Sequence, residues 1–137
     1  MIIIKDIDDG LNFAFPDPEG SFERVFNICE ADERSGYRKS GRQIFTFLNK
    51  LQLKNIKLEK AGLNTIGMDF NERSALFNIY FPFILEDLEI LVDKYPNYAQ
   101  LREDLEWYSE NFNNIEEKFH ESDFIFNLGM MLFTANA

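Results

Sequence analysis

Apolar residues recur along this chain at two different spacings. Near the start, the runs 2–7 and 11–15 are rich in β-branched and aromatic residues and flank Asp8-Asp9-Gly10. An Asp-Gly turn between two such runs is typical of a β-hairpin, because these residues tolerate the backbone conformation that a tight turn needs. We therefore predict an N-terminal hairpin over residues 2–15.

Short apolar runs in the middle of the chain, at 56–59, 65–70 and 75–81, predict additional strands. Pro82 sets the end of this region. A proline inside a helix costs ~3 kcal/mol, whereas the first helical position tolerates it well. We therefore expect a strand that ends at Phe81 and a helix that begins near Pro82.

Helical spacing, with apolar residues three and four positions apart, occurs near 22–29 and 44–51 and again through 84–119. Pro96 divides the last region into two predicted helices. The second of these carries an unbroken apolar seam, which predicts packing against another helix. Its members are Tyr98, Leu101, Leu105, Tyr108, Phe112, Ile115 and Phe119.

The run 124–133 is almost entirely apolar, so we expect it to be buried. Its periodicity does not distinguish a final helix from a strand within the sheet. Together these segments predict a single domain of the α+β class over residues 1–137. We expect a small antiparallel sheet covered by helices, with a C-terminal antiparallel helix pair. The sheet would combine the N-terminal hairpin with strands within 55–81.

The charge is distributed unevenly. Residues 1–70 hold ten Lys/Arg and eleven Asp/Glu, a net charge of -1, while residues 71–137 hold four and thirteen, a net charge of -9. In both C-terminal helices the acidic residues fall opposite the apolar stripe, which predicts two solvent-facing rows that we call the acidic ridges. The first ridge comprises Glu86, Glu89 and Asp93, and the second comprises Glu103, Glu106, Glu110 and Glu117, with Glu121 following on the same side of the helix.

A concentrated negative potential attracts basic partners and repels nucleic acid. We therefore expect the acidic ridges to bind a basic protein, and we expect neither nucleic acid nor a membrane as partner. The alternative is that these faces are charged only to keep the protein soluble. The near absence of interspersed lysine favours the binding interpretation.

Candidate catalytic and metal-binding residues are few. His120 is the single histidine, and Glu116 one turn before it supplies only a second ligand, so we predict no metal site. Cys29 lies on an apolar stripe, which indicates a buried structural thiol rather than a nucleophile. The chain has no second cysteine, so an internal disulfide is excluded. We predict no catalytic residues and no cofactor.

Two loops superficially match ligand-binding motifs. Asp6, Asp8 and Asp9 lack the spacing and the final glutamate of a calcium loop, so we interpret them as a solvated turn. Residues 36–43 have the glycine spacing of a phosphate-binding loop, but Arg42 and Gln43 replace its Lys and Ser/Thr. The segment before them also has helical rather than strand periodicity, so we do not expect nucleotide hydrolysis.

The same loop begins a basic segment. Residues 34–57 contain seven Lys/Arg and no acidic residue. Such a segment can hold a phosphate or a nucleic-acid backbone, or it can form salt bridges with the acidic half of its own molecule or of a second copy. The net charge of -10 makes nucleic acid the weakest of these choices.

The short apolar run at the start has no basic flank, and no stretch approaches the ~20 apolar residues of a membrane span, so we expect a cytoplasmic protein. In general profile the chain is similar to bacterial immunity proteins that neutralise toxin domains, which are short, acidic, cytoplasmic and rich in aromatic residues. The similarity rests on no motif, so it assigns no residue a role. It implies a stoichiometric inhibitor of a basic toxin domain such as a nuclease. A dimeric secretion chaperone and an enzyme with a carboxylate-based site remain as alternatives.

Overall fold

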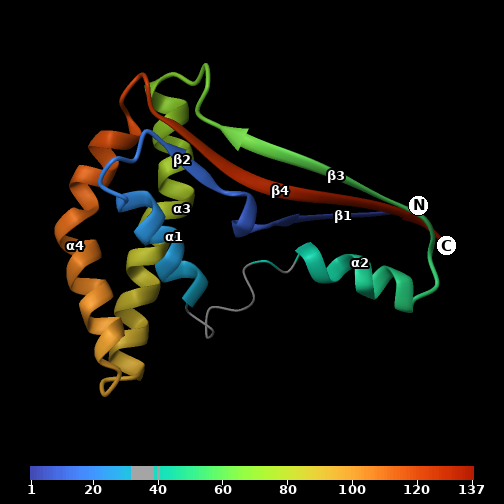
Figure 1. Cartoon of the computed structure of the whole chain (residues 1–137), viewed down its shortest axis with the longest axis horizontal. Coiled ribbons are helices and arrows are strands. Elements are labelled where there is room, and N and C mark those ends of the chain that lie inside the picture. Colours follow the sequence, from blue (N-terminus) through green and yellow to red (C-terminus); the bar gives the residue numbers. More distant parts are fainter. Residues whose placement is uncertain (32–38, 40) are drawn as a thin grey trace.

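The computed structural model describes residues 1–31, 39 and 41–137. In chain order, the elements are β1 (Ile2–Ile7), a short 3-10 helix η1 (Asp9–Leu11), β2 (Phe13–Phe15), α1 (Ser21–Ala31), α2 (Gly41–Lys50), β3 (Lys54–Asn64), α3 (Phe70–Lys94), α4 (Ala99–Phe119) and β4 (Ile125–Asn136). The predicted α+β class, antiparallel sheet and C-terminal helix pair are confirmed (Figure 1).

The last strand is the centre of the sheet. β4 pairs on one side with β3 over nearly its whole length, and on the other side with β1 and β2, which lie end to end. All pairings are antiparallel. The apolar run 124–133, whose state periodicity left open, is therefore the central strand. Its buried face changes along its length: Phe126 and Leu128 belong to the main core, whereas Met131 and Phe133 belong to the cluster under α2. Apolar residues consequently occupy both sets of alternating positions, which masked the alternation expected of a strand.

The predicted N-terminal hairpin is wrong in its pairing. Both strands exist, but β1 and β2 run in the same direction and each pairs with β4 rather than with the other. Instead of reversing at Asp8-Asp9-Gly10, the chain makes one turn of η1. The Asp8 side chain caps this turn by accepting the N–H of Gly10, and the Asp8 N–H donates to the carbonyl of Gly129 on β4.

The strands predicted within 65–81 are also wrong, because α3 begins at Phe70 and runs through Pro82. A capping box fixes its start: Asp69 accepts the N–H of Glu72, and the Glu72 carboxylate accepts the N–H of Asp69. Pro82 removes one helical hydrogen bond, to the carbonyl of Asn78. Asn78 is exposed, so water can reach that carbonyl. Burial on either side of Pro82 keeps the helix continuous.

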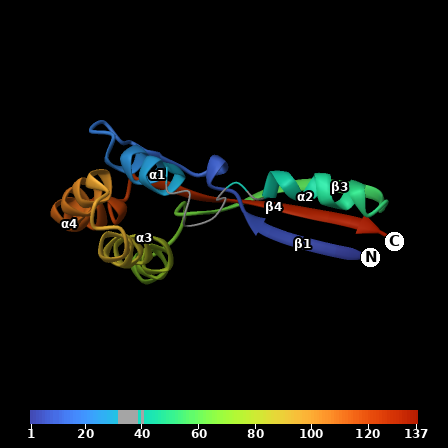
Figure 2. The same cartoon turned by 90° about the horizontal axis from the view of Figure 1, so that it is seen from below.

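The helices cover the two faces of the sheet at different places. α1, α3 and α4 form the main core with the first part of β4, where Phe126 contacts Phe26, Tyr80 and Phe119. α2 covers the opposite face along the second part of β4, through a smaller cluster that includes Leu48, Met131 and Phe133. The second half of the sheet consequently extends from the helical body as an arm (Figure 1, Figure 2).

Buried Arg73 joins the main core to the sheet. Its guanidinium donates hydrogen bonds to four carbonyl oxygens, those of Thr65, Phe119, Glu121 and Phe124, at distances of 2.9–3.2 Å. Two of these carbonyls lie at the C-terminal end of α4, where the helix dipole favours a positive charge. Arg73 therefore ties the end of β3, α3, the end of α4 and the start of β4 together.

Candidate functional site

The predicted seam of α4 and the predicted acidic ridges are confirmed as the inner and outer faces of the C-terminal helices. Leu101, Tyr108, Ile115 and Phe119 are buried, while Tyr98 at the helix start is exposed. All seven carboxylates of the acidic ridges are exposed. The seam packs against α1 and α3, and the three helices lie side by side (Figure 2). The exposed ridge of each C-terminal helix therefore faces away from the helical core.

Six of the seven ridge carboxylates lie on the stretches 86–93 of α3 and 103–110 of α4. The short turn 95–98 joins the two helices. Each stretch spans eight residues, roughly 10 Å of helix. The turn lies far from the sheet (Figure 1). We call these six side chains the acidic tip; Glu117 lies further along α4.

Among the described residues, none of the six carboxylates of the acidic tip forms an ion pair. Of the four basic residues of this half, Arg73 is 7% exposed and bound to carbonyls. Lys118 bonds to Glu121 at the opposite end of α4, which raises the pKa of the Lys118 ammonium. Lys94 and Arg102 lie near the tip, and the Arg24 guanidinium of α1 lies over the ring of Trp107 of α4 at 4.1 Å.

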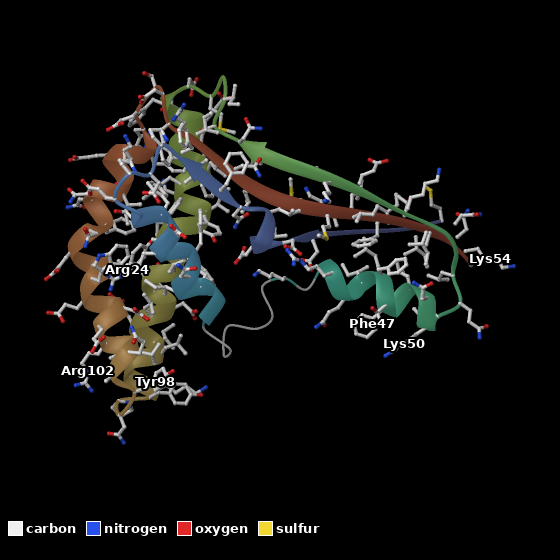
Figure 3. The ribbon with its side chains drawn as sticks, viewed as in Figure 1. Arg24, Phe47, Lys50, Lys54, Tyr98 and Arg102 are labelled. Carbon is white, nitrogen blue, oxygen red and sulfur yellow. The ribbon has the colours of Figure 1, made fainter. Side chains whose placement is uncertain are left out.

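Aromatic side chains border this acidic surface. Tyr98 is 56% exposed and lies with Arg102 at the far end of the helix pair (Figure 3). The Arg102 guanidinium donates to the carbonyl of Pro96, and Lys94 lies over the ring of Tyr95 at 5.5 Å. The tip therefore combines negative charge with a large ring that a partner can cover.

The predicted basic segment 34–57 is divided by the structure. Residues 34–38 lie outside the described residues. Arg42 is held near the start of α2 by Asp8, with an Nε–Oδ2 distance of 3.2 Å. Lys50, Lys54 and Lys57 are exposed on the arm, far from the acidic tip (Figure 3). Salt bridges between these lysines and the acidic helices of the same molecule, one of the expected alternatives, are absent among the described residues.

The Asp8 side chain corrects the interpretation of its loop as a solvated turn. It is completely buried, and its carboxylate accepts hydrogen bonds from Arg42 and from the backbone of Gly10. The carboxylate is therefore a structural link between η1 and α2. The segment before residues 36–43 is helix α1 rather than a strand, as expected when we set the phosphate-loop motif aside.

Cys29 is buried in the main core, in agreement with its predicted structural position. His120 is partly buried at the C-terminal end of α4. Its ring stacks on Phe70 at 4.5 Å and its Nε2 lies 3.5 Å from the Ser74 hydroxyl, while its buried Nδ1 has no hydrogen-bond partner among the described residues. No cluster of three or more metal-ligating side chains occurs in the described part of the chain.

Sequence reasoning missed an apolar groove where α3 meets the sheet. Ile79 and Phe83 are 67% and 57% exposed, and with Ile7 of β1 and Leu128 of β4 they line a groove of about 280 Å³. Ile79, Phe83 and Ile90 follow helical spacing on an exposed face of α3. Assigning 75–81 to a strand hid this stripe; the spacing itself was visible in the sequence.

No model of a known protein family matches this sequence, and no curated protein matches it either. No helix among the described residues has the length and apolar character needed to cross a membrane.

Proposed function

We propose that this chain is a non-catalytic binding protein whose acidic ridges dock on a basic protein, and that it neutralises a toxin domain by covering its active surface. One observation carries the proposal: six exposed carboxylates, on 86–93 of α3 and 103–110 of α4, have no ion-pair partner among the described residues. Cations of a partner that lie over these carboxylates would be attracted to them.

The negative charge of this surface supports a basic toxin domain as the partner. A nuclease carries a basic surface that binds the phosphates of its substrate. An acidic protein that occupies that surface excludes the substrate without needing any catalytic group. Opposite potentials raise the association rate and the specificity of such pairs, whereas aromatic anchors supply affinity. Tyr98, exposed at the acidic tip, is positioned to be one such anchor.

The proposal is tested by capture followed by inhibition. Immobilised wild-type protein should retain a basic protein from an extract of its own host, and the purified partner should lose its activity at a one-to-one ratio. A variant with Glu103, Glu106 and Glu110 changed to Lys should neither retain nor inhibit it. A folded variant that still inhibits at one-to-one would contradict the proposal.

The apolar groove favours a second candidate, a small acidic secretion chaperone that holds an unfolded segment of its client. Ile79, Phe83 and Leu128 line the groove, together with Asp6 and Asp9. Changing Phe83 to Ser would then abolish client binding, while the acidic ridge variants would retain it. The two candidate functions therefore predict opposite results from the same pair of variants.

A further inference from the structure

One face of the sheet arm is covered by α2, whereas the other face is not covered by a helix among the described residues. On the face under α2, Met131 and Phe133 of β4 are 6% and 2% exposed. On the other face, Met130 and Leu132 are only partly buried, although they lie on the central strand. Beside them on β1, Ile3 and Ile7 are 58% and 45% exposed. We call this uncovered surface of the arm the free face.

The strand register shows how charge is arranged on the free face. Leu132 lies between Lys5 of β1 and Glu59 of β3, because it pairs directly with both. Directly paired residues of antiparallel strands point to the same face. Strands lie ~4.8 Å apart, so about 10 Å separates the Lys5 and Glu59 backbones. Within the described part of the chain, neither side chain forms an ion pair.

This row is complementary to itself. When two sheets stack face to face about a two-fold axis parallel to β4, the β1 side of one copy lies over the β3 side of the other. Each residue keeps its position along the strand direction, so Lys5 of each copy faces Glu59 of the partner subunit. The dimer therefore contains two such ion pairs. Leu132 packs at the axis. Other orientations of the axis, such as one perpendicular to the strands, bring the two lysines together instead.

Two rows neighbour this one on the free face. One comprises Ile3, Thr134 and Lys57, and the same axis sets Lys57 opposite Ile3 of the partner subunit. The row on the other side is complementary in size. Ile7, Met130 and Ala61 are paired across the three strands. The same axis sets the large Ile7 opposite the small Ala61 of the partner subunit, with Met130 near the centre. Sheets that pack in this way keep their strands within ~30° of each other, and complementary large and small side chains fill the space between them.

We infer that the free face is the interface of a two-fold symmetric dimer, in which Lys5 and Glu59 form reciprocal ion pairs around a Leu132 centre. A dimer of this kind covers the central strand on its exposed side and pairs two charges that have no ion-pair partner among the described residues. It leaves the acidic tip accessible, since the tip lies at the far end of the helix pair. The inference does not depend on the proposed toxin inhibition.

Charge reversal across the interface tests the inference through sedimentation equilibrium of the full chain. Wild type should form a dimer. Lys5→Glu and Glu59→Lys should each place two like-charged pairs in the interface and raise the dimer dissociation constant by roughly tenfold or more. Mixing the two variants in equal amounts should restore wild-type affinity, because every pair in the mixed dimer is again opposite in charge.

Lys60→Glu is the matched control. Lys60 is the next residue on β3 and pairs with Met131, so it points to the face that α2 covers, and its reversal changes the net charge as Lys5→Glu does. It should leave the dissociation constant within about twofold. A wild-type protein that is monomeric at millimolar concentration would overturn the inference. So would a dimer that Lys5→Glu and Lys60→Glu weaken equally, or one that mixing fails to restore.

Discussion

Arg73 should be the charged side chain whose loss destabilises this protein most. Its guanidinium bonds to four carbonyl oxygens, three of them through Nη1 and one through Nη2. Because Nη1 carries only two hydrogens, we count two full hydrogen bonds for Nη1 and one for Nη2, which makes three. A hydrogen bond that involves a charged group contributes about 1.5–3 kcal/mol, so the set contributes roughly 4–9 kcal/mol. Arg73→Ala should therefore lower the free energy of unfolding by at least ~4 kcal/mol, a large part of the ~5–15 kcal/mol typical of a domain.

Urea titration followed by circular dichroism measures this loss. Arg73→Lys keeps the charge but lacks the planar fork, so it should lose about half as much as Arg73→Ala. Arg73→Met retains packing without any donor and should resemble Arg73→Ala. An Arg73→Ala variant within ~1 kcal/mol of wild type would refute the reasoning, because the four carbonyls would then find water as easily as they find the guanidinium.

Three further predictions concern the core. Thr65→Val removes a buried hydroxyl that bonds to both Phe124 and Phe126, and should cost about 1–3 kcal/mol in the same titration. Ile115→Ala should cost about 2–5 kcal/mol by opening a cavity, while Glu106→Ala on the outer face of α4 should change stability by less than ~0.5 kcal/mol. Burial raises the pKa of the Tyr108 hydroxyl. As the pH rises, the tyrosine of the unfolded chain therefore loses its proton before that of the folded protein. The free energy of unfolding should fall above pH ~10, by up to about 1.4 kcal/mol per pH unit. Tyr108→Phe should reduce that fall, which unfolding titrations between pH 9 and 11 measure.

The sequence predicted the outer surface of the C-terminal helices better than it predicted the sheet. The α4 seam and both acidic ridges follow from helical spacing alone, because each helix has one buried and one exposed face. β4 was ambiguous because its first part buries one face against the main core and its second part buries the other face under α2, so apolar residues occupy both sets of alternating positions. The pairing of β1 with β4 rather than with β2 depends on residues more than a hundred positions away, which local patterns do not report.

Two surface features were not predicted from the sequence, because both depend on the tertiary structure. Pro82 was assigned to a helix start because isolated propensity disfavours it inside a helix, yet tertiary packing on both sides of it keeps α3 continuous. That error hid the stripe of Ile79 and Phe83. The free face depends on register, which sets Lys5 and Glu59 on either side of Leu132 only after β4 has been inserted between their strands.

The most direct test of the central claim is the association rate of the captured basic partner, measured by stopped flow as a function of salt. Reversing Glu103, Glu106 and Glu110 to Lys should slow association by roughly tenfold or more at ~0.01 M salt. The difference should nearly vanish at ~1 M, where the Debye length falls from ~30 Å to ~3 Å. Reversal of Glu86, Glu89 and Asp93 reports whether the α3 ridge faces the partner as well. If both triple variants associate at the wild-type rate at every salt concentration, the acidic ridges serve only solubility and the account is contradicted.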